Sequence, residues 1–281
     1  MRTLEYRLPT PLEVRQRIEA VGDTIHPTEN RRVARDVDEY QLQVAMKYQY
    51  LVAGRVSEIA GKYQPGTDLA YPVYINGKEC LLLPVKTAKR KTEEGWSLRG
   101  PAVPFDKRYE PWAEELWGYL QDNKEPFRFA EKDSSSKRIL EAAITHTFQG
   151  LHWLLKPTSK RGSKWVPFKS HSLRRCRTLM LQVFHKFEPF DLLFYGGWED
   201  EDMAKTPSGM SHYLYVELDQ SPYGLLMLLM QAENFIDKLM VPFNEIHDRI
   251  FEKHIIWDRV SPAWREYFNA NYSTVRLNEG S

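Results

Sequence analysis

Residues of the types that can cut and rejoin a phosphodiester without a metal ion are spread along this chain. Arg55 and Arg174 carry guanidinium groups that stay charged and can each donate two parallel hydrogen bonds to non-bridging phosphate oxygens. Such cations stabilise the negative charge that builds on these oxygens in the transition state. Tyr213 carries a hydroxyl that can attack phosphorus and stay covalently bound, which conserves the bond energy for religation. Together these residues predict covalent phosphoryl transfer.

Further side chains extend this chemistry. Lys86 can donate a proton to the leaving oxygen, although Lys89 and Lys91 compete for the same role. His171 can act as an acid–base group or as a hydrogen-bond donor to the oxyanion, and its alternative role is to cap a helix. Trp198 can donate its indole N–H to a phosphate oxygen, and its alternative is a place in the core.

Two of these residues have neighbours that bear on their role. Glu58 follows Arg55 by one helical turn and is expected to orient the arginine or the histidine rather than to react; the alternative is a surface ion pair. Tyr215 and Tyr195 compete with Tyr213 as the nucleophile. The polar residues before Tyr213 and its Tyr-x-x-Val pattern favour Tyr213.

Basic residues are concentrated in parts of the chain, although the formal net charge is only +1. No Asp or Glu occurs from His152 to Lys186, and a second basic cluster begins at Lys86, whereas acidic residues gather after Trp198. Local charge rather than the total decides whether phosphates bind. Solvated faces are the simpler explanation of such clusters, but the His-x-x-Arg pattern inside the acid-free stretch favours phosphate contact. The expected DNA-binding residues are Lys89, Arg90, Lys91, Lys160, Arg161, Lys164 and Arg175.

Length and composition are those of a globular protein with one large domain or two small ones. The sequence has no apolar run near the roughly 18–20 residues that span a bilayer, and its N-terminus lacks the apolar core of a secretory signal. Cys80 and Cys176 are the only cysteines, and their spacing predicts neither a metal site nor a disulfide framework. We therefore expect a soluble intracellular protein that does not enter a membrane.

Periodicity predicts a mostly helical chain with one small antiparallel sheet early in it. Thr10 is expected to cap the first helix, and Gly54 to end the second helix and place Arg55 at a helix–helix junction. Asn76-Gly77 is a strong hairpin signal between the first two strands. The expected helices are 11–21, 31–52, 55–62, 111–121, 135–155, 171–187 and 222–257 with a break at 242; the expected strands are 70–75, 79–85 and 101–105, with basic loops at 86–100 and 156–168.

Five short motifs, in this order, resemble those of a tyrosine recombinase of the phage-integrase type over roughly residues 9–216. Gly54-Arg55-Val56-Ser57-Glu58 is similar to the family's first arginine box, and Lys86-Thr87 is similar to its catalytic lysine on a turn between strands. His171-Ser172-Leu173-Arg174 is similar to the His-x-x-Arg box, Gly197-Trp198 to the His-or-Trp position, and Tyr213 to the nucleophile. Each motif alone is weak, and their order makes the resemblance specific.

The resemblance implies an α+β fold, mainly α-helical with one small three-stranded antiparallel sheet, like a tyrosine-recombinase catalytic domain over residues 1–220, then a helical extension over 221–281. It implies a site-specific recombinase or integrase that acts on double-stranded DNA as a homo-oligomer, with four protomers cutting four strands. A 3′-phosphotyrosyl link would form, Lys86 would protonate the 5′-oxygen, and neither a metal nor a cofactor would take part. The expected location is the cytoplasm, at the nucleoid, or the host cytoplasm for a virus-encoded protein.

The chain also departs from the family pattern. The sequence shows no separate clamp domain before Arg55, the interval from Trp198 to Tyr213 is stretched, and the part after Val216 is long and acidic. In the family this last part docks on the next protomer; docking and packing on the chain's own core are both open here. Because the stretched interval loosens the tether of the tyrosine, an inactive DNA-binding accessory protein is the alternative function. A third interpretation is an unrelated helical protein with fortuitous motifs.

Overall fold

The first helix begins at a side-chain cap, as the sequence predicts. The computed structural model describes residues 9–60, 70–92, 95–155, 164–197, 223–245, 259 and 261–263. Helix α1 (Pro11–Glu19) follows Thr10, whose Oγ1 accepts a hydrogen bond from the backbone N–H of Glu13 at 3.2 Å. Pro11 occupies the first helical position, where a backbone N–H would have no partner within the helix.

The central helix α2 (Glu39–Leu51) starts later than its apolar spacing indicates. A helix from residue 31 is wrong: the short 3-10 helix η1 (Pro27–Glu29) and a series of turns come first. The side chain of Asp38 accepts a hydrogen bond from the N–H of Tyr40 at 2.9 Å and so caps α2 at its first turn. Most of α2 is buried, and it forms the centre of the helical part of the protein.

The predicted sheet is present. Strand β1 (Tyr71–Ile75) pairs with β2 (Lys78–Leu82), and β2 pairs with β5 (Ala102–Pro104), so that three antiparallel strands lie in the order β1-β2-β5. Asn76 and Gly77 join β1 to β2 with φ angles of +49° and +72°. Two consecutive left-handed residues make the tight turn whose twist matches that of a hairpin. The local turn chemistry therefore determined this register.

The basic segment 86–100, expected to be a loop, is a second hairpin. Strand β3 (Val85–Thr92) pairs antiparallel with β4 (Gly95–Arg99), with a register shift between Lys86 and Lys91. The prediction failed because the segment lacks the alternation of apolar and polar residues that marks a strand. Backbone pairing between its two arms defines it instead.

Among the described residues from 106 to 197 there are four helices: α4 (Ala113–Asp122), α5 (Asp133–Thr147), α6 (Ser170–Val183) and α7 (Pro189–Gly196). α5 ends before residue 155 because Gly150, at φ +98°, turns the chain into strand β6 (His152–Leu155). β6 pairs with β7 (Lys164–Pro167), inside the segment expected to be a loop. The sequence pattern did not reveal α7, since its run of apolar residues has no polar face to show a helical period.

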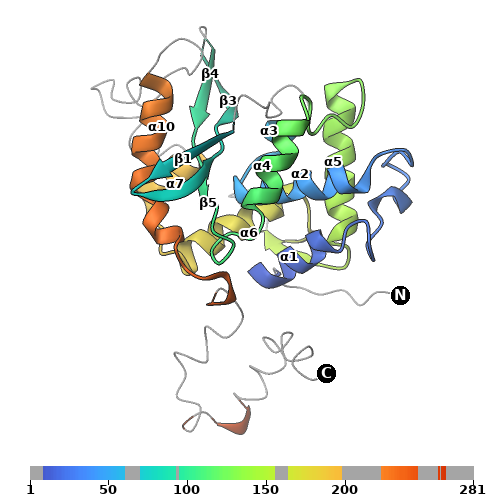
Figure 1. The fold of residues 1–281 in the computed structure, drawn as a ribbon. Coiled ribbons are helices and arrows are strands. Elements are labelled where there is room, and N and C mark those ends of the chain that lie inside the picture. The colour runs from blue at the N-terminus through green and yellow to red at the C-terminus, as the bar shows by residue number, and fades with distance from the viewer. Residues whose placement is uncertain are drawn as a thin grey trace.

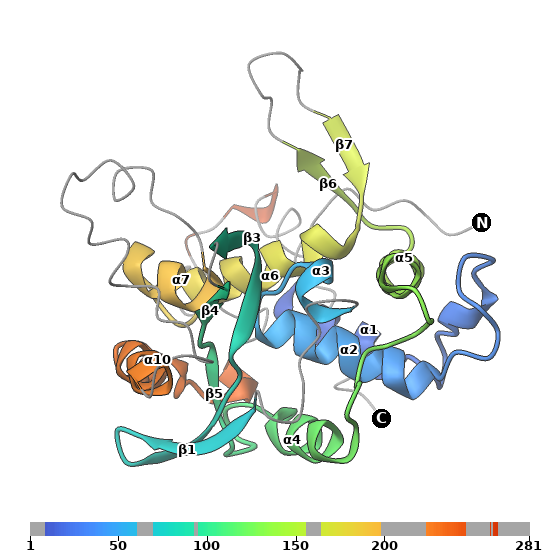
Figure 2. The same cartoon turned by 90° about the horizontal axis from the view of Figure 1, so that it is seen from above.

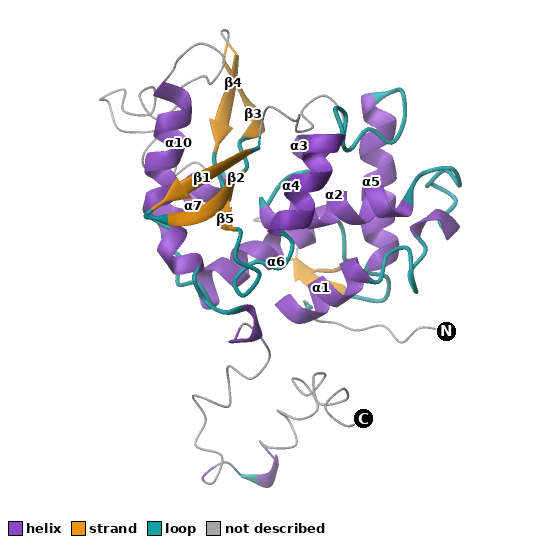
Figure 3. Cartoon of the chain, viewed as in Figure 1, coloured by secondary structure: helices purple, strands orange, loops and turns teal. Residues whose placement is uncertain are grey.

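The three-stranded sheet and the β3–β4 hairpin lie on one side of the molecule, and helices α1, α2, α4 and α5 lie on the other (Figures 1 and 3). One core lies among α1, α2, α4, α5 and α6, and includes the short helix α3 (Val56–Ile59) that follows α2. A second core lies beneath the three-stranded sheet, against α7 and α10 (Tyr223–Glu233). Figure 2 shows α6 running from the helical side toward α7. The two cores therefore meet where α2, α3, β4, α6 and α7 come together.

Residues 225–240 of the C-terminal extension pack on the chain's own core, one of the two arrangements left open by the sequence. Leu228 of α10, Phe235, and Ile236 and Leu239 of the 3-10 helix η3 (Ile236–Leu239) are buried together with residues of the sheet and α7. A further short 3-10 helix, η4 (Phe243–Glu245), follows. No helix in the described ranges is both long and apolar enough to cross a membrane.

Replacing Gly100 with alanine is expected to lower the free energy of unfolding by about 1–3 kcal/mol, the usual effect of overpacking a core. A Cβ atom at this position would lie 2.9 Å from Cβ of Leu228, on the face of α10 that covers the sheet. Urea unfolding of Gly100→Ala, Leu228→Ala and the double variant measures the effect. We expect the two changes to be non-additive, because Leu228→Ala removes Cδ2 and Cγ, which would lie 3.1 and 3.3 Å from the new Cβ; additive effects would mean that α10 does not pack here in solution.

Candidate functional site

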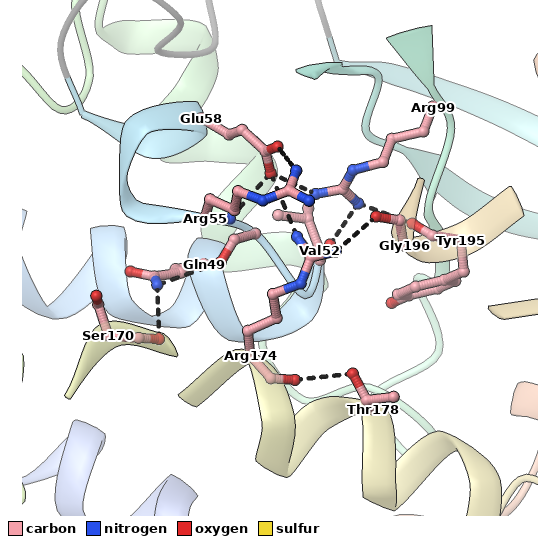
Figure 4. A network of polar contacts seen from close by, with 11 residues as sticks. Gln49, Val52, Arg55, Glu58, Arg99, Ser170, Arg174, Thr178, Tyr195 and Gly196 are labelled. Atoms are coloured by element: carbon pink, nitrogen blue, oxygen red, sulfur yellow. Dashed lines mark hydrogen bonds and ion pairs between the residues drawn. The ribbon is translucent and has the colours of Figure 1, made fainter. Parts of the chain in front are cut away.

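A single buried carboxylate, that of Glu58, gathers three arginines from different elements (Figure 4). Its Oε1 accepts a hydrogen bond from Nη1 of Arg55 at 2.7 Å, and its Oε2 accepts one from Nη2 of Arg99 at 3.1 Å. Nη1 of Arg174 lies 3.7 Å from the same Oε2. We call Arg55, Glu58, Arg99 and Arg174 the arginine cluster. It brings both arginines expected from the sequence to the residue expected to orient one of them.

The turn between α2 and α3 aims Arg55 at this cluster. Ala53 has a φ of +47°, a left-handed conformation that costs a residue with a side chain about 1–3 kcal/mol. At Gly54 a Cβ atom would lie 2.5 Å from Cδ1 of Ile59, so the glycine lets the turn close tightly. Arg55 is the N-cap of α3 with extended backbone angles, and its N–H donates to Oε2 of Glu58 at 2.9 Å. The predicted helix–helix junction is confirmed.

The end of α7 is held against this turn by the other two arginines. Nη1 of Arg99 donates to the carbonyl oxygens of Val52 at 2.5 Å and Tyr195 at 2.7 Å. Nη2 of Arg174 donates to the carbonyl oxygen of Gly196 at 2.9 Å. The last carbonyls of a helix have no partner inside it and carry the negative end of its dipole, so cations are favourable there. The cluster thus joins α3, β4, α6 and α7.

Positive charge exceeds negative charge inside the cluster. Burial opposes ionisation of Glu58, yet the charges of Arg99, Arg174 and Arg55, together with the Arg55 N–H, lower its pKa to about 2. Burial and the neighbouring charge of Arg99 lower the pKa of Arg174 to about 9, despite the favourable charge of Glu58. At neutral pH three guanidinium groups therefore share one carboxylate. An added anion such as a phosphate group would reduce this imbalance.

Access to the cluster is unequal. The side chain of Arg55 is 24% exposed, whereas those of Arg99 and Arg174 are each 2% exposed. A phosphate approaching from solvent would meet Arg55 first. The two buried arginines act on it mainly through their charge, which is weakly screened in a buried position.

Lys86 and His171 lie on elements that surround the cluster. Lys86 is the second residue of β3, is half-buried, and belongs to a strand that packs against α3. His171 is exposed on the first turn of α6, three residues before Arg174, so both side chains project from neighbouring positions of one helix. Lys86 thus lies on a strand that contacts the helix after Arg55, and His171 lies on the helix that carries Arg174.

Several other predicted site residues lie outside the described residues or are described only by their backbone. Trp198, Tyr213, Lys160 and Arg161 fall outside the described ranges, as does the competing nucleophile Tyr215. The remaining expected DNA-binding residues lie on β3, β7 and α6: Lys89, Arg90, Lys91, Lys164 and Arg175.

Tyr195, the other competing nucleophile, is ruled out by its burial in the native fold. Its side chain is fully buried, its hydroxyl donates to the carbonyl of Leu51, and it accepts a hydrogen bond from Nη2 of Arg177 at 3.0 Å. Arg177 is itself 1% exposed. Part of the acid-free stretch is therefore internal structure rather than a phosphate-binding surface, because helix α6 turns these basic positions into the core.

Arg99 is the cluster residue that the motifs did not reveal. It was visible in the sequence only as a member of the second basic cluster, and nothing in its neighbours marks it as part of a site. Its neighbours Gly100 and Pro101 indicate only that a strand ends at Arg99. Only the pairing of β4 with β3 and the packing of β4 against α7 bring its side chain to Glu58.

Comparisons with known proteins do not identify this site. The chain matches no protein-family model, no curated protein and no solved structure. Among the residues that the structure describes, no group of three or more His, Cys, Asp or Glu side chains is arranged to hold a metal ion. The chemistry of the cluster therefore has to be inferred from its own residues.

Proposed function

We propose that this protein is a relative of the tyrosine recombinases that cleaves and rejoins double-stranded DNA through a covalent phosphotyrosyl intermediate, as an oligomer of four protomers. The observation that carries the proposal is the arginine cluster, in which the two arginines of the recombinase motifs converge on Glu58 with a surplus of positive charge. The mixed, mostly helical fold with its small three-stranded antiparallel sheet is compatible with it.

The proposed reaction assigns a role to each residue. Arg55 binds a non-bridging oxygen of the scissile phosphate, and the buried cation of Arg174 stabilises the charge that develops there. Tyr213 gives its hydroxyl proton to His171 as its oxygen forms a bond to phosphorus, while the bond from phosphorus to the 5′-oxygen breaks and Lys86 gives that oxygen its proton. His171 and Trp198 donate hydrogen bonds to the phosphate. Religation is the same sequence in reverse.

A second candidate is a DNA-binding accessory protein that does not cleave. It is favoured by the inward engagement of Arg174, whose guanidinium donates to the carbonyl of Gly196 and is 2% exposed. A phosphate that replaces the carbonyl of Gly196 as the acceptor of this hydrogen bond would have to move the end of α7. In an enzyme the DNA would drive that movement, whereas in an accessory protein the cluster would remain a purely structural link.

We expect wild-type protein to form a covalent adduct with DNA, and Tyr213→Phe to form at least about 10³-fold less, because no other group replaces the nucleophile. The target sequence is unknown, so the substrate is a pool of nicked duplexes with randomised sequence, in which loss of the short cut strand prevents religation. The adduct is detected as DNA that migrates slowly in denaturing gels and is released by protease.

Tyr215→Phe is the matched control, since it removes the same hydroxyl two positions away. It should leave the adduct unchanged. If the adduct still forms with Tyr213→Phe and is lost with Tyr215→Phe, the nucleophile is Tyr215. If wild-type protein binds DNA in a salt-dependent manner but forms no adduct, the protein is a DNA-binding accessory protein and not an enzyme.

A further inference from the structure

A basic pocket lies on the helical side of the molecule, apart from the arginine cluster. Its volume is about 930 Å³, and it is bounded by the loop after η1, by α5 and by the start of α6. Four cationic side chains and one acidic one line it: Arg31, Arg32, Arg138, Lys169 and Glu141. η1 and α6 both pack against α5, so the three walls belong to one folded unit.

The cations of this pocket are available to a ligand. Arg31, Arg32, Arg138 and Lys169 are all exposed, and no salt bridge joins any of them to a carboxylate within the described part of the chain. The exposed arginines Arg108 and Arg128, by contrast, each pair with a carboxylate. The pocket thus combines a concave shape with unneutralised positive charge.

The loop that carries two of these cations has a defined shape. The side-chain oxygen of Asn30 accepts a hydrogen bond from the N–H of Arg32 at 3.1 Å, and its carbonyl accepts one from the N–H of Val33 at 2.8 Å. Such a turn, closed by an asparagine side chain, restricts the backbone of the two residues inside it. Arg31 and Arg32 are therefore presented from an ordered turn.

The lining of the pocket favours a charged polymer over a small apolar molecule. Sites for small ligands are lined mainly by apolar and aromatic side chains. Here Ala142 is the one apolar residue among the described lining residues. Exposed Arg and Lys side chains drawn from separate elements are instead typical of contacts to a nucleic-acid backbone, where each cation neutralises one phosphate.

The pocket also shares its framework with the arginine cluster. Lys169 and Ser170, which line the pocket, start the helix that carries Arg174. Nε2 of Gln49 donates to the carbonyl of Ser170 at 3.2 Å and to that of Gly54 at 3.3 Å, which ties this helix start to the turn before Arg55 (Figure 4). The start of α6 therefore belongs both to the wall of the pocket and to the framework of the cluster.

We propose that the basic pocket binds backbone phosphates of duplex DNA beside the phosphate that is cleaved. This inference rests on the proposed function for its choice of DNA as the polymer. It adds a contact surface made by residues 31, 32, 138 and 169, all different from the DNA-binding residues expected from the sequence. Contacts to the backbone set position and affinity without reading the base sequence.

The test measures how DNA binding depends on salt. Fluorescence anisotropy of a labelled duplex is recorded over a range of KCl concentrations for wild-type protein and for Arg31→Gln/Arg138→Gln. Removing one phosphate-binding cation lowers the magnitude of the slope of log K against log salt by about 0.9, so we expect a reduction of about 1.8. Lys107→Gln/Arg108→Gln removes the same two charges from the exposed segment before α4 and should leave the slope unchanged.

Three outcomes would contradict DNA binding by this pocket. They are the same slope in the wild-type protein and the pocket variant, an equal reduction of the slope in Lys107→Gln/Arg108→Gln, and pocket-dependent binding that is stronger to duplex RNA than to duplex DNA. Arg31→Lys/Arg138→Lys keeps the charges and should restore the wild-type slope. The adduct assay separates the two proposals. If the pocket variant changes the slope but the wild-type protein forms no adduct, the pocket binds DNA and the proposed DNA cleavage is contradicted. If the wild-type protein forms the adduct but the pocket variant leaves the slope unchanged, DNA cleavage is supported and DNA binding by the pocket is contradicted.

Discussion

Arg174→Met is expected to reduce formation of the covalent DNA adduct by about 10²–10³-fold, the usual effect of removing one group that stabilises transition-state charge. The same variant is expected to keep or exceed the stability of the wild-type protein. Burial and the charge of Arg99 lower the pKa of Arg174 to about 9, which means that its surroundings disfavour the charged form. Removing one member of a buried ion pair is costly when it leaves the opposite charge alone, but here the positive charges outnumber the negative one, so the loss of one cation leaves no unpaired carboxylate.

The structure explains why stability would survive this change. Glu58 keeps its hydrogen bonds to Arg55 at 2.7 Å and to Arg99 at 3.1 Å, so no buried carboxylate is left without a cation. The carbonyl of Gly196 loses one donor, which offsets part of the gain. A residue that weakens the fold and strengthens the reaction is typical of a functional site. Urea unfolding and the adduct assay on the same preparations measure both effects.

Arg177→Met is the matched control, because Arg177 is also buried and lies one turn further along α6. Its guanidinium carbon lies 5.6 Å from the ring of Tyr50 and 5.7 Å from that of Tyr195, and it donates to the hydroxyl of Tyr195. These contacts favour the cation, so its loss should lower stability while folded protein still forms the adduct. If Arg174→Met destabilises the protein as strongly and leaves the adduct intact, Arg174 is a structural residue.

Glu58→Gln is expected to lower the free energy of unfolding at neutral pH by about 3–5 kcal/mol, the effect of breaking a buried ion pair from one side. Three guanidinium groups would remain around a neutral amide, two of them buried. The amide oxygen can still accept one of their hydrogen bonds, but it cannot offset their mutual repulsion. Urea unfolding at neutral pH measures the loss.

The pH dependence of this loss follows from the pKa of Glu58, which is about 2 in the folded protein against an ordinary value of 4.5. A carboxyl whose pKa is lowered by folding contributes stability that is complete above its unfolded pKa and disappears as the pH falls through its folded pKa. The difference between wild type and Glu58→Gln should therefore shrink from about pH 5 toward pH 2. The lowering of the Glu58 pKa from 4.5 to about 2 corresponds to a contribution of about 3 kcal/mol to the free energy of unfolding.

Glu114→Gln is the control for this series. Glu114 pairs with Lys107 at the surface, with 56% and 70% of the two side chains exposed. Its removal should change stability by less than about 1 kcal/mol, because exposed pairs are screened by water and salt. A difference between wild type and Glu58→Gln that stays constant down to pH 2 would show that the carboxylate charge is not what the arginines need.

Features set by neighbouring residues were predictable from the sequence. The Thr10 cap, the Asn76-Gly77 hairpin and the junction that carries Arg55 each depend on side chains within a few positions of one another. The helix start placed at residue 31 failed for a local reason too, since the cap at Asp38 outweighs the apolar spacing before it. The β3–β4 hairpin and α7 were missed because pairing and packing, not their own composition, specify them.

The sequence by itself determined which residues of this protein carry side chains able to bind a phosphate and which short turns aim them, because residue type, spacing and turn chemistry are local. Only the tertiary structure decided which of these residues meet. Arg99 reaches Glu58 across 41 positions and the carbonyl of Tyr195 across 96. Long-range packing likewise buries Arg174 in the same cluster and seals the hydroxyl of Tyr195 in the core. The interaction between charges becomes strong where packing excludes water, and no local sequence pattern predicts where water is excluded.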